Sequence, residues 1–185
     1  MTISVSKVSG ITKYWSGGTT CLEAVMIDTR TEIAGRLTVL VGLDVSWVSH
    51  AGDMVTVQFG PQRRYTLRGR SREDGAWALH VQCAWQLERE GFTVATRADL
   101  RDSDEKAHAT ARRLHEIFVG QGPVKVEDAS ADDAGGIVVS FSRGYRLVVI
   151  PDRVEDDEDW RFFAPGNDAA HLVIEGGAVA PESFD

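Results

Sequence analysis

A strict alternation of side chains runs through residues 76–85, which read Ala76-Trp77-Ala78-Leu79-His80-Val81-Gln82-Cys83-Ala84-Trp85. The odd-numbered positions are apolar or cysteine, whereas the even-numbered positions are small or polar. Successive side chains of a β-strand point to opposite faces of its sheet, so one face of this stretch is expected to enter a core. The alternation predicts a single half-buried strand, with His80 and Gln82 on the face away from Cys83.

Helix-start signals lie on both sides of this strand. Residues 29–32 (Thr-Arg-Thr-Glu) and residues 102–105 (Asp-Ser-Asp-Glu) each fit a capping box, in which the first side chain caps the helix. Apolar residues at helical spacing follow both boxes, and the two patterns end at Gly42 and Gly120, where a helix commonly stops. The sequence therefore predicts two helices, one before the alternating strand and one after it.

Three further strand patterns follow each predicted helix, and they match in order. The pairs are Val45–Val48 with Val124–Val126, Val55–Phe59 with Ile137–Phe141, and Tyr65–Leu67 with Tyr145–Leu147. A fourth pair sets residues 77–85 against Trp160–Phe163. The sequence predicts an α+β fold of two similar halves, each a helix followed by an antiparallel β meander of about four strands. Residues 1–100 form the N-terminal half and residues 101–185 the C-terminal half, and both are expected to pack as a single unit.

Composition and charge narrow the function classes. The 185 residues are 43% hydrophobic, which suffices for one core, and the net charge is −8. Residues 151–185 contain ten acidic residues and two arginines, so the negative charge is concentrated there. General nucleic-acid binding is not expected, because phosphate neutralisation needs a basic surface. No apolar run approaches the roughly 18–20 residues that span a bilayer, and residues 1–10 lack a signal peptide, so the sequence predicts a cytoplasmic protein without a membrane partner.

Catalytic and metal motifs are missing from the sequence. His80 and Cys83 would face opposite sides of a strand, which argues against a nucleophile–base pair. His108 and His115 are seven positions apart, about 10 Å along a helix, which is too far to share one metal ion. There is no phosphate-binding glycine loop, nucleophile elbow or zinc-protease motif. The sequence predicts no catalytic residue, no cofactor and no metal site.

An acidic run follows the strand pattern at Tyr145–Leu147. Its members are Asp152, Glu155, Asp156, Asp157, Glu158 and Asp159. The run lacks the alternating ligands and the central glycine of a calcium-binding loop, so it is expected to form a charged turn between strands. Such a turn is also a candidate docking surface for a basic protein partner.

Arginine is concentrated around the predicted strand at Tyr65–Leu67. Arg64, Arg68 and Arg70 are expected to form a stripe on one face, which suits the binding of phosphate or of a carboxylate-rich partner. The same pattern is typical of an edge strand that is protected by charge. Because this stripe and the acidic run have opposite charge at similar places in the two halves, they are expected to attract each other. The attraction would act either within one chain or between two copies, which leaves a homo-oligomer open.

Two longer motifs carry a family resemblance. The first is Gly75-Ala-Trp-Ala-Leu-His-Val-Gln-Cys-Ala-Trp85 with Asp53–Gly60 before it, and the second is Phe141-Ser-Arg-Gly-Tyr-Arg-Leu-Val-Val-Ile-Pro-Asp152 with Trp160–Phe163 and His171-Leu-Val after it. Together they resemble a family of bacterial proteins, largely actinobacterial and similar to immunity proteins, that has no established activity. The resemblance covers about residues 36–175. It implies a small bacterial cytoplasmic protein from a conflict or defence setting, and it implies no catalytic residue.

Three function classes remain after these exclusions. The leading prediction is a non-enzymatic protein-interaction module, of immunity type or a defence-associated accessory protein, that binds a protein partner through a surface including the acidic run. The alternative is a small-ligand-binding protein or an unrecognised enzyme, with a pocket between the halves lined by His80, Gln82, Trp160 and His171. The third is a structural subunit of a larger complex.

Overall fold

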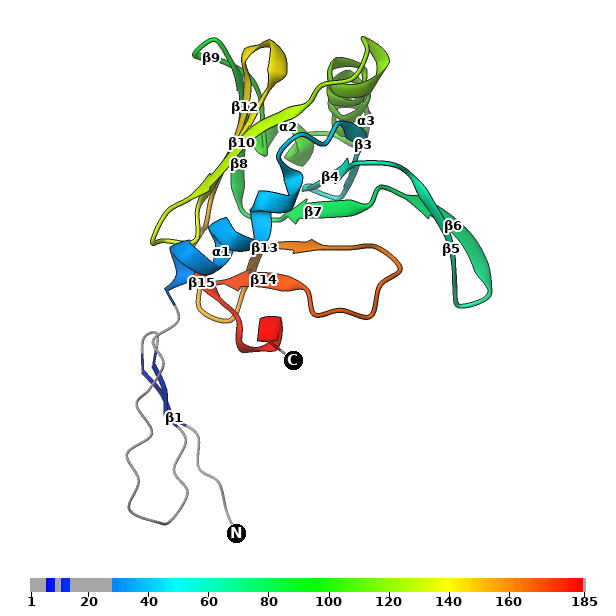
Figure 1. The fold of residues 1–185 in the computed structure, drawn as a ribbon. Helices are drawn as coiled ribbons and strands as arrows, with labels where there is room; N and C mark the ends of the chain where they lie inside the picture. Colours follow the sequence, from blue (N-terminus) through cyan, green and yellow to red (C-terminus); the bar gives the residue numbers. More distant parts are fainter. Residues whose placement is uncertain (1–5, 9–10, 14–27, 185) are drawn as a thin grey trace, which may run out of the picture.

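The protein contains two antiparallel sheets, seen in a computed structural model that describes residues 6–8, 11–13 and 28–184 (Figure 1). Most of the stretch in which no signal peptide is expected lies outside the described residues. The six-stranded sheet has the order β15 (Ala178–Val179), β14 (Leu172–Glu175), β13 (Glu158–Phe163), β7 (Trp77–Val81), β4 (Met54–Phe59), β3 (Val45–Ala51). The five-stranded sheet has the order β10 (Val126–Ala131), β11 (Ile137–Phe141), β12 (Tyr145–Ile150), β8 (Ala84–Arg89), β9 (Phe92–Thr96). The predicted α+β class with antiparallel strands is therefore confirmed.

Two small ribbons complete the strands. β5 (Arg63–Leu67) pairs with β6 (Arg70–Asp74), and β1 (Ser6–Val8) pairs with β2 (Ile11–Lys13). The ribbon β5–β6 projects from the body and is joined to neither large sheet (Figure 1). The predicted place of Tyr65–Leu67 as the third strand of a meander is wrong, because β7 takes that place beside β4.

Both predicted helices are present, but their capping residues differ by one position from the prediction. α1 (Thr29–Leu37) is capped by Asp28, whose carboxylate accepts a hydrogen bond from the Thr31 amide. α3 (Asp104–His115) is capped by Ser103, and a short helix, α2 (Ala98–Arg101), precedes it. The helices continue as a 3-10 turn, η1 (Thr38–Leu40), and as a π-helical turn, η2 (Glu116–Gly120), so each helical segment ends close to the predicted glycine.

The alternating stretch 76–85 forms two strands instead of one. β7 ends at Val81 and β8 begins at Ala84, and the two strands belong to different sheets. The chain bends there because the amides of Gln82 and Cys83 both donate to the carbonyl oxygen of Asp159, at 2.8 and 3.0 Å. The alternation persists through the bend, since the inward side chains of both strands enter the same core.

The strands of each half are distributed over both sheets. β3, β4 and β7 lie beside β13, β14 and β15, whereas β10, β11 and β12 lie beside β8 and β9. Neither half therefore forms the predicted meander of about four strands within one sheet. Helices close the sides of the sandwich: α1 lies against β10 and β15, and α3 lies against β3 while α2 lies against β9.

The core fills the space between the two sheets. Phe59, Leu79 and Trp160 from one sheet meet Phe141 and Leu87 from the other, and all five are buried. A void in this core has a volume of about 10 Å³, which is about the space of one water molecule.

Candidate functional site

The outer face of the six-stranded sheet carries a row of ring-shaped side chains. The ring of His80, on β7, meets Phe163, on β13, edge to face at 4.9 Å, and Phe163 stacks on His171 at 4.3 Å. His80 lies opposite Arg161 in the β7–β13 register, which places Arg161 on the same face. This row runs along the seam where strands of the two halves pair.

A carboxylate on the same face organises the polar groups. Glu158 accepts hydrogen bonds from Gln82 Nε2 at 2.8 Å and from Arg161 Nε at 2.7 Å, and a second nitrogen of Arg161 also contacts it. Burial alone would raise the pKa of Glu158, but the Arg161 guanidinium and the Gln82 amide outweigh it and hold that pKa below its usual range. Glu158 is therefore committed to an internal pair.

The surroundings of both histidines on this face lower their pKa values. Burial lowers the pKa of His80, and the nearby positive charge of Arg161 lowers it further. The same two causes lower the pKa of His171. Neutral imidazoles beside a paired arginine suit stacking and hydrogen bonding.

The pocket residues predicted from the sequence are only partly brought together. His80, Gln82 and His171 share the outer face, but Trp160 is fully buried on the opposite face. Its indole N–H donates to the carbonyl oxygen of Gly135 at 2.8 Å. Together with the packed core, this placement removes Trp160 from any ligand surface.

Cys83 is a core residue without nucleophilic character. Burial, and next the charge of Asp159, raise the pKa of its thiol to about 12. A thiol with such a pKa is protonated at neutral pH, and the thiolate is the reactive form.

Nearly all residues of the ribbon β5–β6 are exposed. Arg68 and Gly69, with φ of 49° and 75°, form its two-residue turn. The turn sets Arg70 opposite Leu67, so Arg70 shares the face of Leu67 and Tyr65, while Arg64 lies on the other face opposite Glu73. The predicted single stripe of Arg64, Arg68 and Arg70 is therefore wrong, because the chain reverses inside it.

The base of the ribbon is anchored to the sheet. The Tyr65 hydroxyl donates to Asp74 at 2.6 Å, Gln58 Nε2 donates to the other Asp74 oxygen at 2.8 Å, and the Gly75 amide donates to Gln58 Oε1. Burial, and next the Asp74 carboxylate, raise the pKa of Tyr65. These bonds fix the direction in which the ribbon leaves the body.

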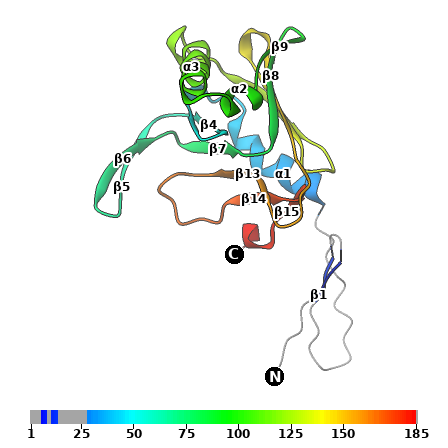
Figure 2. The same ribbon diagram turned by 180° about the vertical axis from the view of Figure 1, so that it is seen from behind.

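The connection between β13 and β14, residues 164–171, lies beside the ribbon in both ribbon views (Figures 1 and 2). The ring of Tyr65 rests on Gly166, where an added Cβ would lie 2.7 Å from the ring. Thr56 and Ala78, which point to this outer face, are 8% and 1% exposed. The ribbon and residues 164–171 therefore border the outer face that carries His80, Phe163 and His171.

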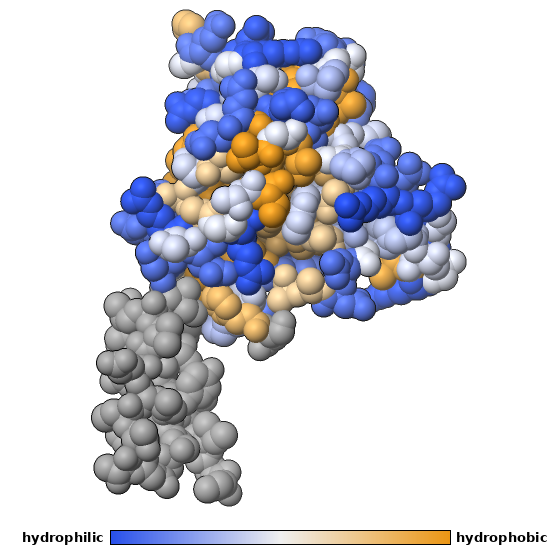
Figure 3. Space-filling view, viewed as in Figure 1, coloured by the Kyte–Doolittle hydropathy of each residue, from blue (hydrophilic) through white to orange (hydrophobic). Residues whose placement is uncertain are grey.

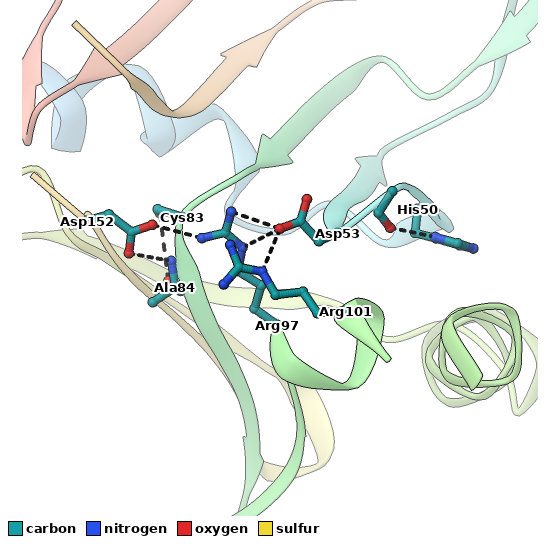
Figure 4. A network of polar contacts seen from close by, with 8 residues as sticks. His50, Asp53, Cys83, Ala84, Arg97, Arg101 and Asp152 are labelled. Atoms are coloured by element: carbon teal, nitrogen blue, oxygen red, sulfur yellow. Dashed lines mark hydrogen bonds and ion pairs between the residues drawn. The ribbon is translucent and has the colours of Figure 1, made fainter. Parts of the chain in front are cut away.

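The predicted acidic surface is smaller than the sequence suggests. Asp152 accepts a hydrogen bond from the Ala84 amide and pairs with Arg97 at 2.8 Å, as Figure 4 shows. Asp159 is 3% exposed and accepts from the amides of Asp152 and Gly177 at 2.7 and 2.8 Å. Asp152, Glu155, Asp156 and Asp157 are exposed, whereas Glu158 is half-buried and Asp159 is buried.

The network around Arg97 was not foreseen from the sequence. Asp53 accepts from Arg97 at 3.0 Å and from Arg101 at 2.8 Å, so one carboxylate joins the β3–β4 turn to both ends of α2 (Figure 4). The Arg101 hydrogen bond is the largest cause that lowers the pKa of Asp53, ahead of the charge of Arg97. No local pattern marks these residues, because they are far apart in the chain. They brace the corner where the chain passes between the sheets.

The acidic turn and the arginine ribbon lie on opposite sides of the molecule (Figures 1 and 2). Within residues 28–184 no ion pair joins them. Their attraction within one chain is therefore not observed, and an attraction between two copies stays a prediction.

An apolar patch occupies the centre of the face shown in Figure 3, around the end of α1 and η1. Val39 in η1 and Val41 directly after it are 43% and 51% exposed. The ribbon side of the same view is strongly hydrophilic.

No protein family, curated protein sequence or solved structure matches the chain. The resemblance to a bacterial immunity-like family consequently stays a prediction. Among the described helices, none is both long and apolar enough to cross a membrane.

Proposed function

We propose that this protein is a non-enzymatic protein-binding module whose contact surface is the ribbon β5–β6 together with residues 164–171. The projecting ribbon is the observation that carries the proposal. Arg63, Arg64, Arg68, Arg70 and Arg72 are all exposed on it, on a chain whose net charge is −8. A basic element held away from an acidic body concentrates positive potential where an incoming acidic partner meets it first.

We also propose that the two halves arose by duplication of one unit. Exchanging the halves maps β3, β4, β7, β8 and β9 onto β10, β11, β12, β13 and β14. This exchange converts the order of the five-stranded sheet into the order of the six-stranded sheet without β15. The helices follow the same exchange, since α1 lies on β10 and α3 on β3. The strand connections then become comparable between the halves.

The longer connections support the location of the contact surface. Residues 60–76 join β4 to β7, whereas residues 142–144 join their counterparts, and residues 164–171 are matched by residues 90–91. These two additions lie side by side, and the counterpart connections of the other half lack both. Binding functions are concentrated in connections that a rigid scaffold holds in place. A third addition, the acidic turn at 151–157 against residues 82–83, is the second contact that we propose, for a basic surface.

Site-specific photocrosslinking tests the proposal directly. A photoreactive residue would replace Thr66 on the ribbon or, as a control, Ser130, which is exposed on β10. In a lysate of the host cell at low salt, we expect one protein to crosslink from position 66 and not from position 130. Arg68→Glu with Arg70→Glu should remove that product. Identical products from both positions would overturn the proposed surface.

A small-ligand surface is the second candidate, and the row of His80, Phe163 and His171 favours it. The expected result for this candidate is a bound small mass in native mass spectrometry that is lost in His171→Ala. Crosslinking from position 66 would not depend on such a ligand. The two candidates therefore give separate readouts. The proposed setting is the bacterial cytoplasm, as the resemblance implies.

A further inference from the structure

We propose that the ribbon β5–β6 binds its partner by strand addition, and that the added strand is an extended acidic segment. This inference rests on the proposed function and names the binding mode and the partner chemistry. In strand addition, backbone hydrogen bonds supply affinity and alternate side chains supply specificity.

The first support is the pair of unpaired ribbon edges. In the described residues, β5 and β6 pair with each other alone, and no backbone hydrogen bond joins them to another element. In a hairpin with a two-residue turn, alternate residues direct their backbone N–H and C=O groups outward. On β5 these residues are Arg64 and Thr66, and on β6 they are Ser71 and Glu73. An isolated two-stranded ribbon is marginally stable, and a third strand stabilises it.

The second support is the charge of the ribbon, which selects the added strand. Like charges that lie opposite each other across strands are destabilising. The arginines therefore disfavour pairing with the ribbon of a second copy or with any basic strand, which is how natural edges avoid aggregation. A strand with carboxylates at alternate positions meets the same arginines favourably, because guanidinium and carboxylate bind in a two-pronged geometry.

The third support is a single apolar position among the arginines. Leu67 is 46% exposed and lies opposite Arg70, on the face of Tyr65. Arg63, Arg70 and Arg72 share this face in the β5–β6 register. A segment with carboxylates at alternate positions, and one apolar residue among them on the same face, would cover Leu67 while its carboxylates reach these three arginines. The recognised sequence thus has a period of two, as an added strand requires.

The ribbon is also prepared for binding at its base. Asp74 holds both Tyr65 and Gln58, and Gly166 supports the Tyr65 ring, so the strands keep their direction without a partner. A platform that is ordered in advance loses little conformational freedom on binding. The acidic turn of a second copy does not fit this platform, because Arg153 and Asp156 have positive φ of 59° and 62° and the turn is not extended.

Synthetic ligands test the mode without knowledge of the natural partner. The probe is a labelled ten-residue peptide that alternates glutamate and valine, measured by fluorescence anisotropy against the full-length protein. We expect saturable binding that weakens about tenfold between 50 and 300 mM salt. Amide hydrogen exchange should slow at Arg64 and Thr66 or at Ser71 and Glu73, that is, along one edge. A peptide with lysine in place of glutamate should not bind.

Two variants separate a specific loss from a general effect of charge. Arg68→Glu with Arg70→Glu should reduce peptide affinity at least tenfold and leave the thermal midpoint of unfolding within a few degrees. Arg30→Glu with Arg112→Glu makes the same change in net charge on the helices and should leave affinity within about twofold. Equal losses in both double variants would overturn the inference.

Further outcomes would also overturn it. An acidic peptide with proline at alternate positions cannot add as a strand, so its equal binding would show side-chain attraction alone. Equal binding of a ten-nucleotide thymidine oligomer would show a general polyanion surface. A ribbon-dependent dimer without peptide would identify a second copy as the occupant. If crosslinking from position 66 instead yields a partner through a non-acidic segment, the binding mode fails while the proposed function stands.

Discussion

Asp159 shows how one side chain can hold two distant segments together. Its carboxylate accepts the amides of Asp152 and Gly177, and its own carbonyl oxygen receives the amides of Gln82 and Cys83. We expect Asp159→Ala to lower the free energy of unfolding by about 3 kcal/mol, because buried amides lose their acceptor. Asp157→Asn, two positions away on the exposed turn, should change it by less than about 0.5 kcal/mol. Urea unfolding measures both, and equal small effects would contradict the structural role of Asp159.

Gly166 and Gly69 form a matched pair for testing the contact under the ribbon. Their φ angles are +74° and +75°, but a Cβ at Gly166 would lie 2.7 Å from the Tyr65 ring, whereas a Cβ at Gly69 would meet nothing within 4 Å. We expect Gly69→Ala to cost about 1 kcal/mol for the left-handed backbone alone. Gly166→Ala should cost at least about 1 kcal/mol more, since the ring cannot withdraw without losing its bond to Asp74. Urea unfolding of both variants measures these costs. Equal costs would contradict a close contact between Gly166 and the Tyr65 ring.

His80 and His171 give the unfolding free energy a pH dependence near neutrality. Their folded-state pKa values lie below the ordinary 6.5, so the unfolded chain takes up protons first as the pH falls. The contribution of the two histidines to the unfolding free energy is therefore fully present above about pH 6.5, and it is lost as the pH falls from there toward their folded-state pKa values. Unfolding at a series of pH values should show this decline, and His80→Gln with His171→Gln should flatten it. An unchanged profile in the double variant would contradict the assignment.

The strands illustrate what the sequence predicted and where prediction stopped. The alternation around Trp77–Trp85 correctly placed the inward side chains, because a residue's face depends on its immediate neighbours. It missed the bend at Gln82 and Cys83, because the bend is imposed by a carbonyl oxygen of the other half. For the same reason the acidic run looked like one surface, although Asp152 and Asp159 are used by distant partners. Charge is visible in a sequence, whereas the group that neutralises it is not.

The ribbon is an element that the scaffold should tolerate losing. Residues 60–76 join β4 to β7, and the counterpart connection between β11 and β12 needs only residues 142–144. Replacing residues 60–76 with Ser-Arg-Gly should preserve the far-ultraviolet circular dichroism of the sheets and the cooperative unfolding transition, while the partner no longer copurifies with the tagged protein. Its control is the full chain with Thr66→Ser, which keeps the ribbon. A chain that fails to fold after the replacement would show that the ribbon stabilises the sandwich, contrary to this expectation.

At the scale of the whole molecule, the exchange of strands makes the halves interdependent. β7 and β8 are consecutive in the chain but belong to different sheets, and the same holds for β12 and β13. Neither half can leave without opening both sheets, since β7 pairs with β13 and β8 pairs with β12. Such an arrangement predicts one cooperative unit in place of two lobes.

Single-tryptophan variants test this interdependence. One variant would keep Trp77, which stacks on Phe162 in the six-stranded sheet, and the other would keep Trp85, in the five-stranded sheet, with phenylalanine at the remaining tryptophans. In urea, the fluorescence of each should change at the same midpoint as the circular dichroism of that variant, because both sheets open in one step. Adding Asp159→Ala should lower both midpoints equally. The hydrogen bonds of Asp159 lie at the corner between the sheets, and none of them involves Trp77 or Trp85. Midpoints that separate within one variant would mean that each sheet unfolds alone, and the exchanged strands would then not couple the halves.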